Sequence, residues 1–169
     1  MRILLRKAAV LAAMAVVVGM GRADEDKVPL DKLPKAITAA VKTRFPKGEL
    51  VEAAKETSKD GDKVKVEYEV TVKENGAKID VILTPGGQIT LMEKVIAVKD
   101  LPKVVADAID GQYPKATIKT AEEIIKVTDG KESLDCYEVL LVTADKKTFE
   151  LKLSVEGKIT ETEEKKDKD

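Results

Sequence analysis

Two stretches of this chain repeat one pattern: LPKAITAAVKTRFPKGEL at residues 33–50 and LPKVVADAIDGQYPKATI at residues 101–118. Both begin with Leu-Pro-Lys and both carry an aromatic-Pro-Lys. A Tyr-Glu-Val at 68–70 and 137–139 and a Gly-x-Ile at 87–89 and 157–159 follow in the same order. The offset between the copies drifts from 68 to 70, and we expect both inserted residues to lie in turns. Chance rarely preserves such an order, so the pattern indicates two tandem repeats.

Each copy is predicted to begin with a helix. An apolar or aromatic residue recurs at every fourth position, which forms one apolar stripe along a helix. The positions are Leu33, Ile37, Val41 and Phe45, and then Leu101, Val105, Ile109 and Tyr113. A proline near the start is tolerated there, and the proline after each aromatic residue ends the helix. We therefore expect Phe45 and Tyr113 to close the end of each stripe.

Strands are predicted to follow each helix. In VKVEYEVTV, from Val64 to Val72, β-branched and aromatic residues alternate with polar ones, which is typical of a half-buried strand. Asn75-Gly76 then predicts a hairpin turn. Residues 50–55 and 118–127 are ambiguous, because their Ala and Glu content favours helix while their place before Asp-Gly turns favours a hairpin strand. With strand there, the chain is α+β, and each repeat is one helix packed on a four-stranded antiparallel sheet.

The signatures LP…FPKGEL…YEV…GGQI and LP…YPKATI…YEV…EGKI resemble the PepSY-like family related to β-lactamase-inhibitor-protein repeats. The resemblance covers about residues 28 to 163. It implies tandem helix-plus-sheet modules, often side by side in one continuous curved sheet. It also implies an exported protein that binds or inhibits other proteins and needs no cofactor.

The start of the chain has the pattern of a signal peptide. A basic beginning precedes an apolar run, Ala8–Met20, that is too short to span a bilayer, and small residues precede a cleavage site after Ala23. An uncleaved anchor is the alternative. The expected domains are a signal peptide (1–23), a first repeat (24–97), a second repeat (98–163) and a disordered charged tail (164–169), which ends the almost wholly charged stretch from residue 161. We expect a periplasmic or secreted protein without a stable membrane anchor after cleavage.

Charge and cysteine content exclude some partners. Removal of the signal peptide lowers the basic residues from 30 to 26 against 31 acidic ones, a net charge of −5. Such a chain is a poor nucleic-acid binder, because phosphate contacts need a basic surface. Cys136 is the single cysteine, so no intrachain disulfide is expected. It should face away from the helices, as a half-buried residue or as half of an intermolecular disulfide.

The chemistry of most enzymes is missing from the sequence. The chain contains no histidine, which removes the usual general base and the commonest zinc ligand. Asp60-Gly61-Asp62 could begin a calcium loop, but the following Lys63-Val64-Lys65 favours a hairpin turn. Composition alone leaves open a glycosidase-type carboxylate pair. The strand glutamates fall at outward positions, where charge keeps a sheet soluble; they are Glu67, Glu69, Glu138 and Glu150. We expect no catalytic, metal or cofactor site.

The preferred functional hypothesis is an exported, non-enzymatic binding module, either protein-binding or peptidase-inhibitor-like, that holds an unidentified protein or peptide on the open sheet face. Leu140 and Val142 are the predicted anchors, and Glu67, Glu69 and Glu138 are the predicted steering charges. Alternatively, Leu140 and Val142 pack against the chain's own strands. Two other classes are an envelope structural or stress protein with the sheet as a passive scaffold and, less favoured, a carboxylate-based hydrolase. All five aromatic residues are expected to face the core.

Overall fold

The computed structural model describes residues 24–60 and 63–165. The first repeat contains α1 (Lys35–Arg44), β2 (Glu49–Asp60), β3 (Lys63–Glu74), β4 (Ala77–Leu83) and β5 (Ile89–Ile96). The second contains α2 (Lys103–Gln112), β6 (Thr117–Thr128), β7 (Lys131–Val142), β8 (Thr148–Ser154) and β9 (Ile159–Lys165). Short 3-10 turns, η1 (Leu30–Lys32) and η2 (Val98–Asp100), precede the helices, and β1 (Asp24–Lys27) precedes both. The predicted signal peptide and the centre of the Asp-Gly-Asp turn lie outside the described residues.

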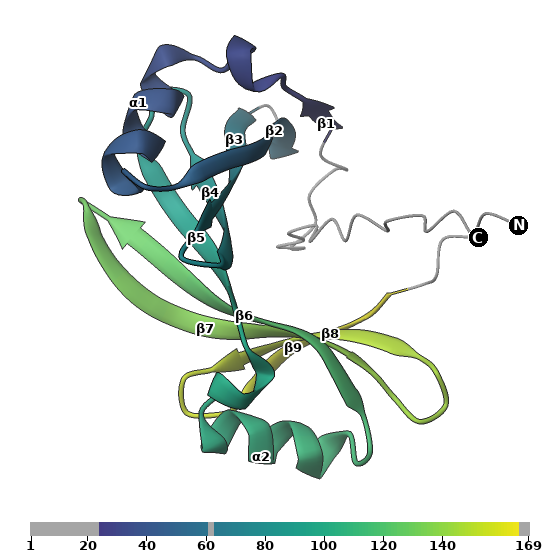
Figure 1. Cartoon of the computed structure of the whole chain (residues 1–169). Coiled ribbons are helices and arrows are strands. Elements are labelled where there is room, and N and C mark those ends of the chain that lie inside the picture. Colours follow the sequence, from purple (N-terminus) through teal and green to yellow (C-terminus); the bar gives the residue numbers. More distant parts are fainter. Residues whose placement is uncertain (1–23, 61–62, 166–169) are drawn as a thin grey trace, which may run out of the picture.

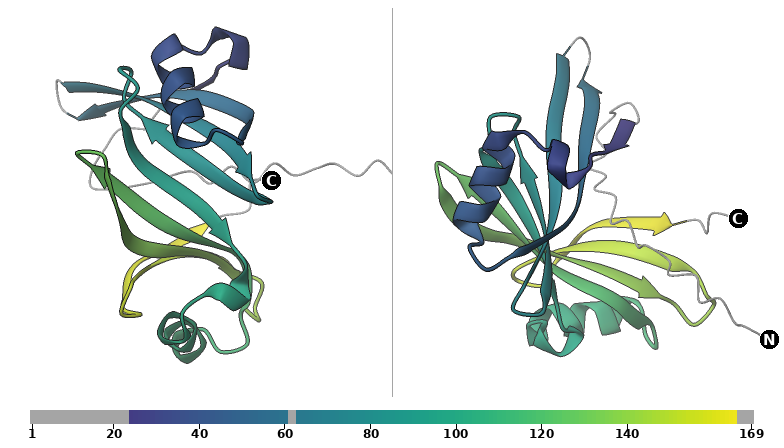
Figure 2. Two further views of the ribbon diagram at one scale, coloured as in Figure 1. Left: turned by 60° about the vertical axis from the view of Figure 1, so that its left-hand side comes forward. Right: turned by 45° about the horizontal axis from the view of Figure 1, so that its top comes forward.

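All nine strands form one antiparallel sheet whose spatial order is the order of the chain, β1 to β9. The last strand of the first repeat, β5, pairs with the first strand of the second, β6, so the repeats share one twisted and curved sheet (Figures 1 and 2). This confirms the predicted α+β architecture of two tandem repeats. The ambiguous stretches 50–55 and 118–127 are strands, within β2 and β6. The short β1 is an addition that the sequence patterns did not predict.

Both helices pack on the same face of the sheet. The buried residues Ile37 and Val41 of α1 join the first core, and Val105 and Ile109 of α2 join the second. Strand β6 contributes to both cores. Its Ile125 and Val127 pack against the first and its Ala121 against the second. Because residues an even number apart in a strand point to one side, both cores lie on one face. We call the opposite side the helix-free face.

The aromatic residues point toward the helix side, as predicted. Phe45 follows α1 and is only 3% exposed, and its backbone N–H donates to the Val41 carbonyl at 2.8 Å. Tyr113 takes the same place after α2 but is half-buried, and its ring lies 5.5 Å from that of Phe149. Tyr68 and Phe149 pack at the margins of the cores, and Tyr137 is buried.

The repeated Gly-x-Ile motif has a physical cause in the turns that follow β4 and β8. Gly87 and Gly157 have φ angles of 86° and 84°, which side chains rarely adopt. A Cβ atom would lie 2.7 Å from the carbonyl oxygen of Ala36 at Gly87, and 2.5 Å from that of Val104 at Gly157. Each turn therefore contacts the backbone of its helix, at a distance that only glycine allows.

The two residues inserted into the second repeat lie in different places. One lies in the β7–β8 connection. The other is Asp135, the extra residue of a bulge in β7, where Leu134 pairs with Ile125 and Cys136 pairs with Ile124. The prediction that both insertions fall in turns is therefore wrong for this residue. A bulge absorbs one residue by bending the strand, without disturbing the pairing on either side.

The predicted tail also begins later than expected. Glu164 and Lys165 belong to β9, as do residues 161–163, and the strand pairs with β8 along its length. Cross-strand ion pairs compensate its charges: Lys152 with Glu161 at 3.3 Å, and Lys165 with Glu150 at 3.0 Å. The composition indicated disorder because it does not reveal this pairing. Residues 166–169 lie outside the described part of the chain.

Candidate functional site

The predicted site residues all lie on the helix-free face, as the strand alternation indicated. Glu67 and Glu69 belong to β3, and Glu138, Leu140 and Val142 belong to β7. The two groups do not meet, because β4, β5 and β6 lie between β3 and β7 in the sheet. Their role in binding stays a prediction.

These residues are less exposed than the sequence indicated. Leu140, opposite Glu150, and Val142, opposite Thr148, are both half-buried. Glu138 is only 7% exposed, so its expected placement in solvent is wrong. A position that faces away from the helices is not thereby solvated, because neighbouring side chains of the curved sheet cover it. The Glu138 carboxylate instead lies 4.0 Å from the ammonium of Lys152.

Glu138 is one end of a line of buried carboxyl groups that crosses the centre of the helix-free face. Asp80 of β4, Glu93 of β5 and Glu122 of β6 are 2%, 4% and 6% exposed. Asp80 pairs with Glu93, and Glu122 pairs with Glu138. Glu93 pairs with Ile124, two residues from Glu122, so the line continues diagonally from β5 to β6. We call Asp80, Glu93, Glu122 and Glu138 the acidic row.

A parallel line of apolar side chains lies beside the acidic row. Each member is two residues from an acidic one on the same strand, and therefore on the same face. The members are Ile82 on β4, Leu91 on β5, Ile124 on β6 and Cys136 on β7, which pack together as one cluster. We call this line the apolar strip. It confirms that Cys136 faces away from the helices, and burial raises the pKa of its thiol to about 11.

Positive charge compensates the members of the acidic row unevenly. Asp80 accepts a hydrogen bond from the hydroxyl of Thr71 and another from Lys78 at 2.8 Å. Glu138 has Lys152 nearby. Between them, Lys78 also lowers the pKa of Glu122, whereas every neighbouring charge that shifts the pKa of Glu93 raises it. These two central carboxyl groups lie where the last strand of one repeat meets the first strand of the next.

The environment of the acidic row shifts its ionisation. Burial, together with the neighbouring Glu138 and Glu122, raises the pKa of Glu93 to about 9. Burial also raises the pKa of Glu122, and burial together with Glu150 raises that of Glu138 to about 7. Near neutral pH Glu93 therefore holds a proton.

Sequence reasoning missed this row. Its signal was a single acid within an apolar strand, as in Ile79-Asp80-Val81-Ile82-Leu83 and Leu91-Met92-Glu93. Alternation alone does not show whether such an isolated acid is buried, because one face of a strand is often exposed to solvent. No set of three or more Cys, Asp or Glu side chains within residues 24–60 and 63–165 is arranged to hold a metal ion. Neither of the described helices is long and apolar enough to cross a membrane.

A second feature joins the repeats on the helix side. The guanidinium of Arg44 on α1 donates to Glu132 of the β6–β7 hairpin, with Nε–Oε1 and Nη2–Oε2 distances of 2.6 and 3.0 Å. The same guanidinium lies 4.7 Å from the centre of the Phe45 ring. A cavity of about 420 Å³ lies beside this contact, between α1, the β4–β5 turn and the hairpin.

Known structures share this fold. They include a putative periplasmic protein from Bacteroides eggerthii DSM 20697 (TM-score 0.61, 12% identity, covering 78% of this chain and 88% of that one). A DUF2874 family protein from Bacteroides uniformis ATCC 8492 gives 0.61 and 15%, with the same coverage. A BLIP-like protein from Bacteroides fragilis NCTC 9343 gives 0.57 and 16%, covering 80% and 89%. No curated protein matches the chain.

The family model described as "Putative beta-lactamase-inhibitor-like, PepSY-like" matches residues 21–91 and again residues 87–161. The two matches overlap at residues 87–91, where β5 begins, so the second match starts one strand before the second repeat. The chain therefore belongs to the PepSY-like, beta-lactamase-inhibitor-like family.

Proposed function

We propose that this protein is an exported, non-enzymatic binding module that holds a protein or peptide partner on the helix-free face of its sheet. One observation carries the proposal: the half-buried Leu140 and Val142 lie on this face, two and four residues from the carboxyl group of Glu138 on the same strand. An apolar patch bordered by charge is typical of interaction surfaces, because it combines burial with orientation. The helices cover the other face and hold the sheet in shape.

Family membership and fold support the non-enzymatic reading. The family model carries a beta-lactamase-inhibitor-like description, and one structure of the same fold is described as BLIP-like. Another is described as a periplasmic protein. These likenesses agree with the signal peptide expected at residues 1–23. Amino-terminal sequencing of the protein recovered from the cell envelope should begin at Asp24, and recovery of Met1 on a cytoplasmic protein would contradict export.

Leu140 and Val142 remain the proposed anchors, with Glu67, Glu69 and Glu138 as orienting charges. Half-burial leaves each anchor one surface for a partner and fixes its rotamer beforehand. Lys152 on β8 pairs with Glu138 and with Glu161 of the edge strand β9. Its positive charge therefore lies between the proposed anchors and that edge.

Site-specific photo-crosslinking in the native host tests the proposal. p-Benzoylphenylalanine replaces Leu140 in one variant and Val104, an exposed residue on α2, in the matched control. We expect a discrete adduct from position 140 and none from position 104. In a separate variant, Leu140→Lys should abolish binding of the partner identified in that adduct, while the circular dichroism melt stays near wild type. Equal adducts from both positions, or none from position 140, would move the function away from this face.

A further inference from the structure

The short strand β1 lies against β2 in the way that β5 lies against β6. Each helix follows an extended strand and a 3-10 turn, and β1, η1 and α1 correspond to the end of β5, η2 and α2 at the 68-residue offset of the helices. Val28 packs on the first core as Ile96 packs on the second. The N–H of Val28 donates to Ala53 at 2.9 Å, and Ile96 pairs with Ala121, the counterpart of Ala53. β1 therefore repeats, at the edge of the sheet, the joint between the two repeats.

A pair of opposite charges accompanies this joint in both places. Lys94 of β5 lies opposite Glu123 of β6, and their side chains form an ion pair at 3.2 Å. The counterpart of Glu123 in β2 is Lys55, because each pairs with the tyrosine of a Tyr-Glu-Val motif. The residue of β1 opposite Lys55 is Asp26, so the charges are again opposite, with their signs reversed. Opposite charges at facing positions stabilise an antiparallel pair of strands.

The other edge strand, β9, has the same charge pattern as β1. It ends the second repeat as β5 ends the first, and the Gly-x-Ile motif fixes the correspondence, since its isoleucine pairs with the last leucine of β4 or β8. Counted from that isoleucine, Glu164 corresponds to Lys94. If β9 lay against β2 in the register of β5 on β6, Glu164 would face Lys55, as Asp26 does. Residues 163–165 read Glu-Glu-Lys, and residues 25–27 read Glu-Asp-Lys.

The two edges of the sheet are thus the two halves of one joint (Figure 1). Within the described chain no strand pairs with the outer side of β9, and an unpaired edge is a template for another strand. Glu164 lies 3.6 Å from Lys147, but both side chains are about half exposed, so this contact is weak. β1 pairs with only residues 54–57 of the twelve-residue β2. A β9 in the same register would face residues 54–58, one pair more.

We propose that the edge of β2 accepts β9 of a second copy of this chain, in a head-to-tail joint with the β5–β6 register, and that β1 occupies this edge in the single molecule. β1 is tethered to β2 through α1, which gives it a high effective concentration at the edge. The residues of β2 that correspond to Ile125 and Val127 are polar, so the joint between copies depends on strand pairing alone. The wild-type chain should therefore be a monomer, and loss of β1 pairing should uncover the surface. This joint lies apart from the anchors proposed on β7.

Proline in β1 tests the proposal on the full chain. The N–H groups of an antiparallel strand alternate in direction, so that of Asp26 faces β2, as that of Val28 does, and that of Glu25 faces away. Asp26→Pro should therefore break the pairing of β1, and Glu25→Pro is the matched control. Size-exclusion chromatography with light scattering, over a range of concentrations, should find monomers for wild type and Glu25→Pro. Asp26→Pro should associate as its concentration rises, with a circular dichroism melt near wild type.

Charge reversals in the Asp26→Pro background identify the partner strand. Glu164→Lys and Lys55→Glu each place like charges opposite each other, and each should weaken self-association about 5-fold. An equimolar mixture of the two should recover the association, because joints between unlike molecules again pair opposite charges. Glu156→Lys, in the exposed β8–β9 turn, is the control and should change nothing.

Val28→Ser provides a second way to release β1, since it removes the contact of β1 with the first core, and it should associate as Asp26→Pro does. A folded Asp26→Pro or Val28→Ser that stays monomeric at every concentration would refute the inference. Association that the charge reversals leave unchanged would also overturn it, because the released β2 would then pair with a surface other than β9. Wild type that associates as strongly as Asp26→Pro would show that β1 does not occupy the joint.

Discussion

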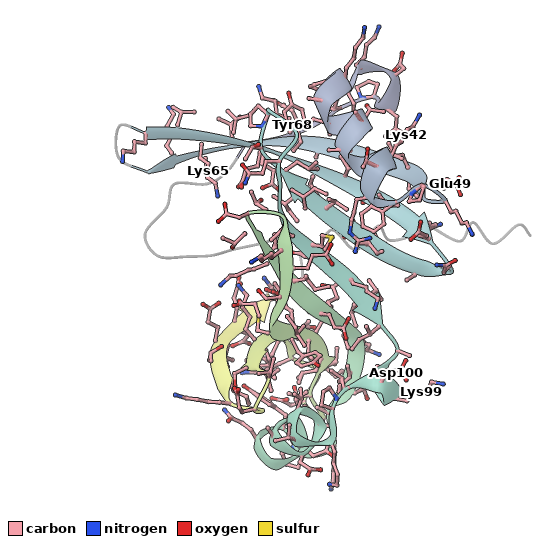
Figure 3. All side chains as sticks on the ribbon, turned by 90° about the vertical axis from the view of Figure 1, so that its left-hand side faces the viewer. Lys42, Glu49, Lys65, Tyr68, Lys99 and Asp100 are labelled. Atoms are coloured by element: carbon pink, nitrogen blue, oxygen red, sulfur yellow. The ribbon has the colours of Figure 1, made fainter. Side chains whose placement is uncertain are left out.

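The long hairpins of the two repeats have the same secondary structure but different surroundings. The β6–β7 hairpin lies against α1, and its Ile125 and Val127 pack on the first core. The β2–β3 hairpin projects freely, with Lys65 on its outer part (Figures 2 and 3). The residues of β2 that correspond to Ile125 and Val127 by strand pairing are Thr57 and Lys59. One element thus serves as an interface in the second repeat and as a polar end in the first, as terminal units of repeat arrays commonly do.

The contact between Arg44 and Glu132 follows the same division. Its counterparts by position are Gln112 on α2 and Val64 on β3, which is 59% exposed. The bulge at Asp135 is also confined to the second repeat, and Lys126 pairs with Asp135 at 2.9 Å. A bulge bends its strand, which accounts for the lean of this hairpin toward α1. These differences between the copies lie where the copies meet, whereas the residue inserted into the β7–β8 connection lies elsewhere.

The largest difference in stability should come from the residues that close each helix. Phe45→Ala should cost about 3–5 kcal/mol, because the ring is almost fully buried in the first core. Tyr113→Ala should cost less, about 1–3 kcal/mol, because its ring is half-buried. Urea unfolding of both variants measures the difference. Equal losses would show that the two ends are packed alike.

The two glycine turns should lose the same amount of stability when their glycine is replaced by alanine. Gly87→Ala and Gly157→Ala should each cost about 2 kcal/mol, because each forces a side chain into a positive φ angle and against a helix carbonyl. Gly111→Ala in α2 is the control, because a Cβ at this position contacts no other atom. This substitution should stabilise the protein by up to about 1 kcal/mol. A cost at only one of the two turns would show that the repeats dock their turns differently.

The junction between the repeats should carry the dependence of stability on pH. The pKa of Glu93 is about 9 in the folded protein, against an ordinary value of 4.5, so the folded state keeps a proton that the unfolded state loses. Stability should therefore fall as pH rises from 5 to 9, by about 1–2 kcal/mol more in wild type than in Glu93→Gln. Denaturant titrations at pH 5, 7 and 9 measure this, with Glu67→Gln as the control that keeps the wild-type slope. A parallel slope in Glu93→Gln would contradict the assignment.

The smallest effect should come from the contact that distinguishes the hairpins. Arg44→Ala and Glu132→Ala should each cost about 0.5–1 kcal/mol, because the pair is partly exposed although its geometry is bidentate. A double-mutant cycle measures the coupling, and Val64→Ala, at the corresponding position of the free hairpin, should cost under about 0.5 kcal/mol. No coupling would mean that Ile125 and Val127 hold the hairpin without the ion pair.

Periodicity predicted the helices, the strands that follow each Asp-Gly turn and the face on which their side chains lie. The first strand of each repeat was predicted only from its place before an Asp-Gly turn. Periodicity could not predict β1, because Asp24–Lys27 has no apolar pattern and forms a strand only by pairing with residues 54–57 of β2. It also missed the acidic row. Alternation shows that Asp80, Glu93, Glu122 and Glu138 face away from the helices, but their burial depends on neighbours brought together from four strands. The proposed anchors Leu140 and Val142 were placed on the correct face, while their exposure was set by the same neighbours.

The order of the strands also bears on how the chain reaches this structure. Every strand pairs only with the strands that precede and follow it in sequence, so the sheet can grow one hairpin at a time from the amino terminus. A chain delivered in that direction can build α1 and β2–β5 before the second half has arrived. Its first core stays open on one side until Ile125 and Val127 are added. Residues 117–142 thus complete one half of the molecule while they begin the other, which makes this hairpin the step at which assembly of the halves becomes cooperative.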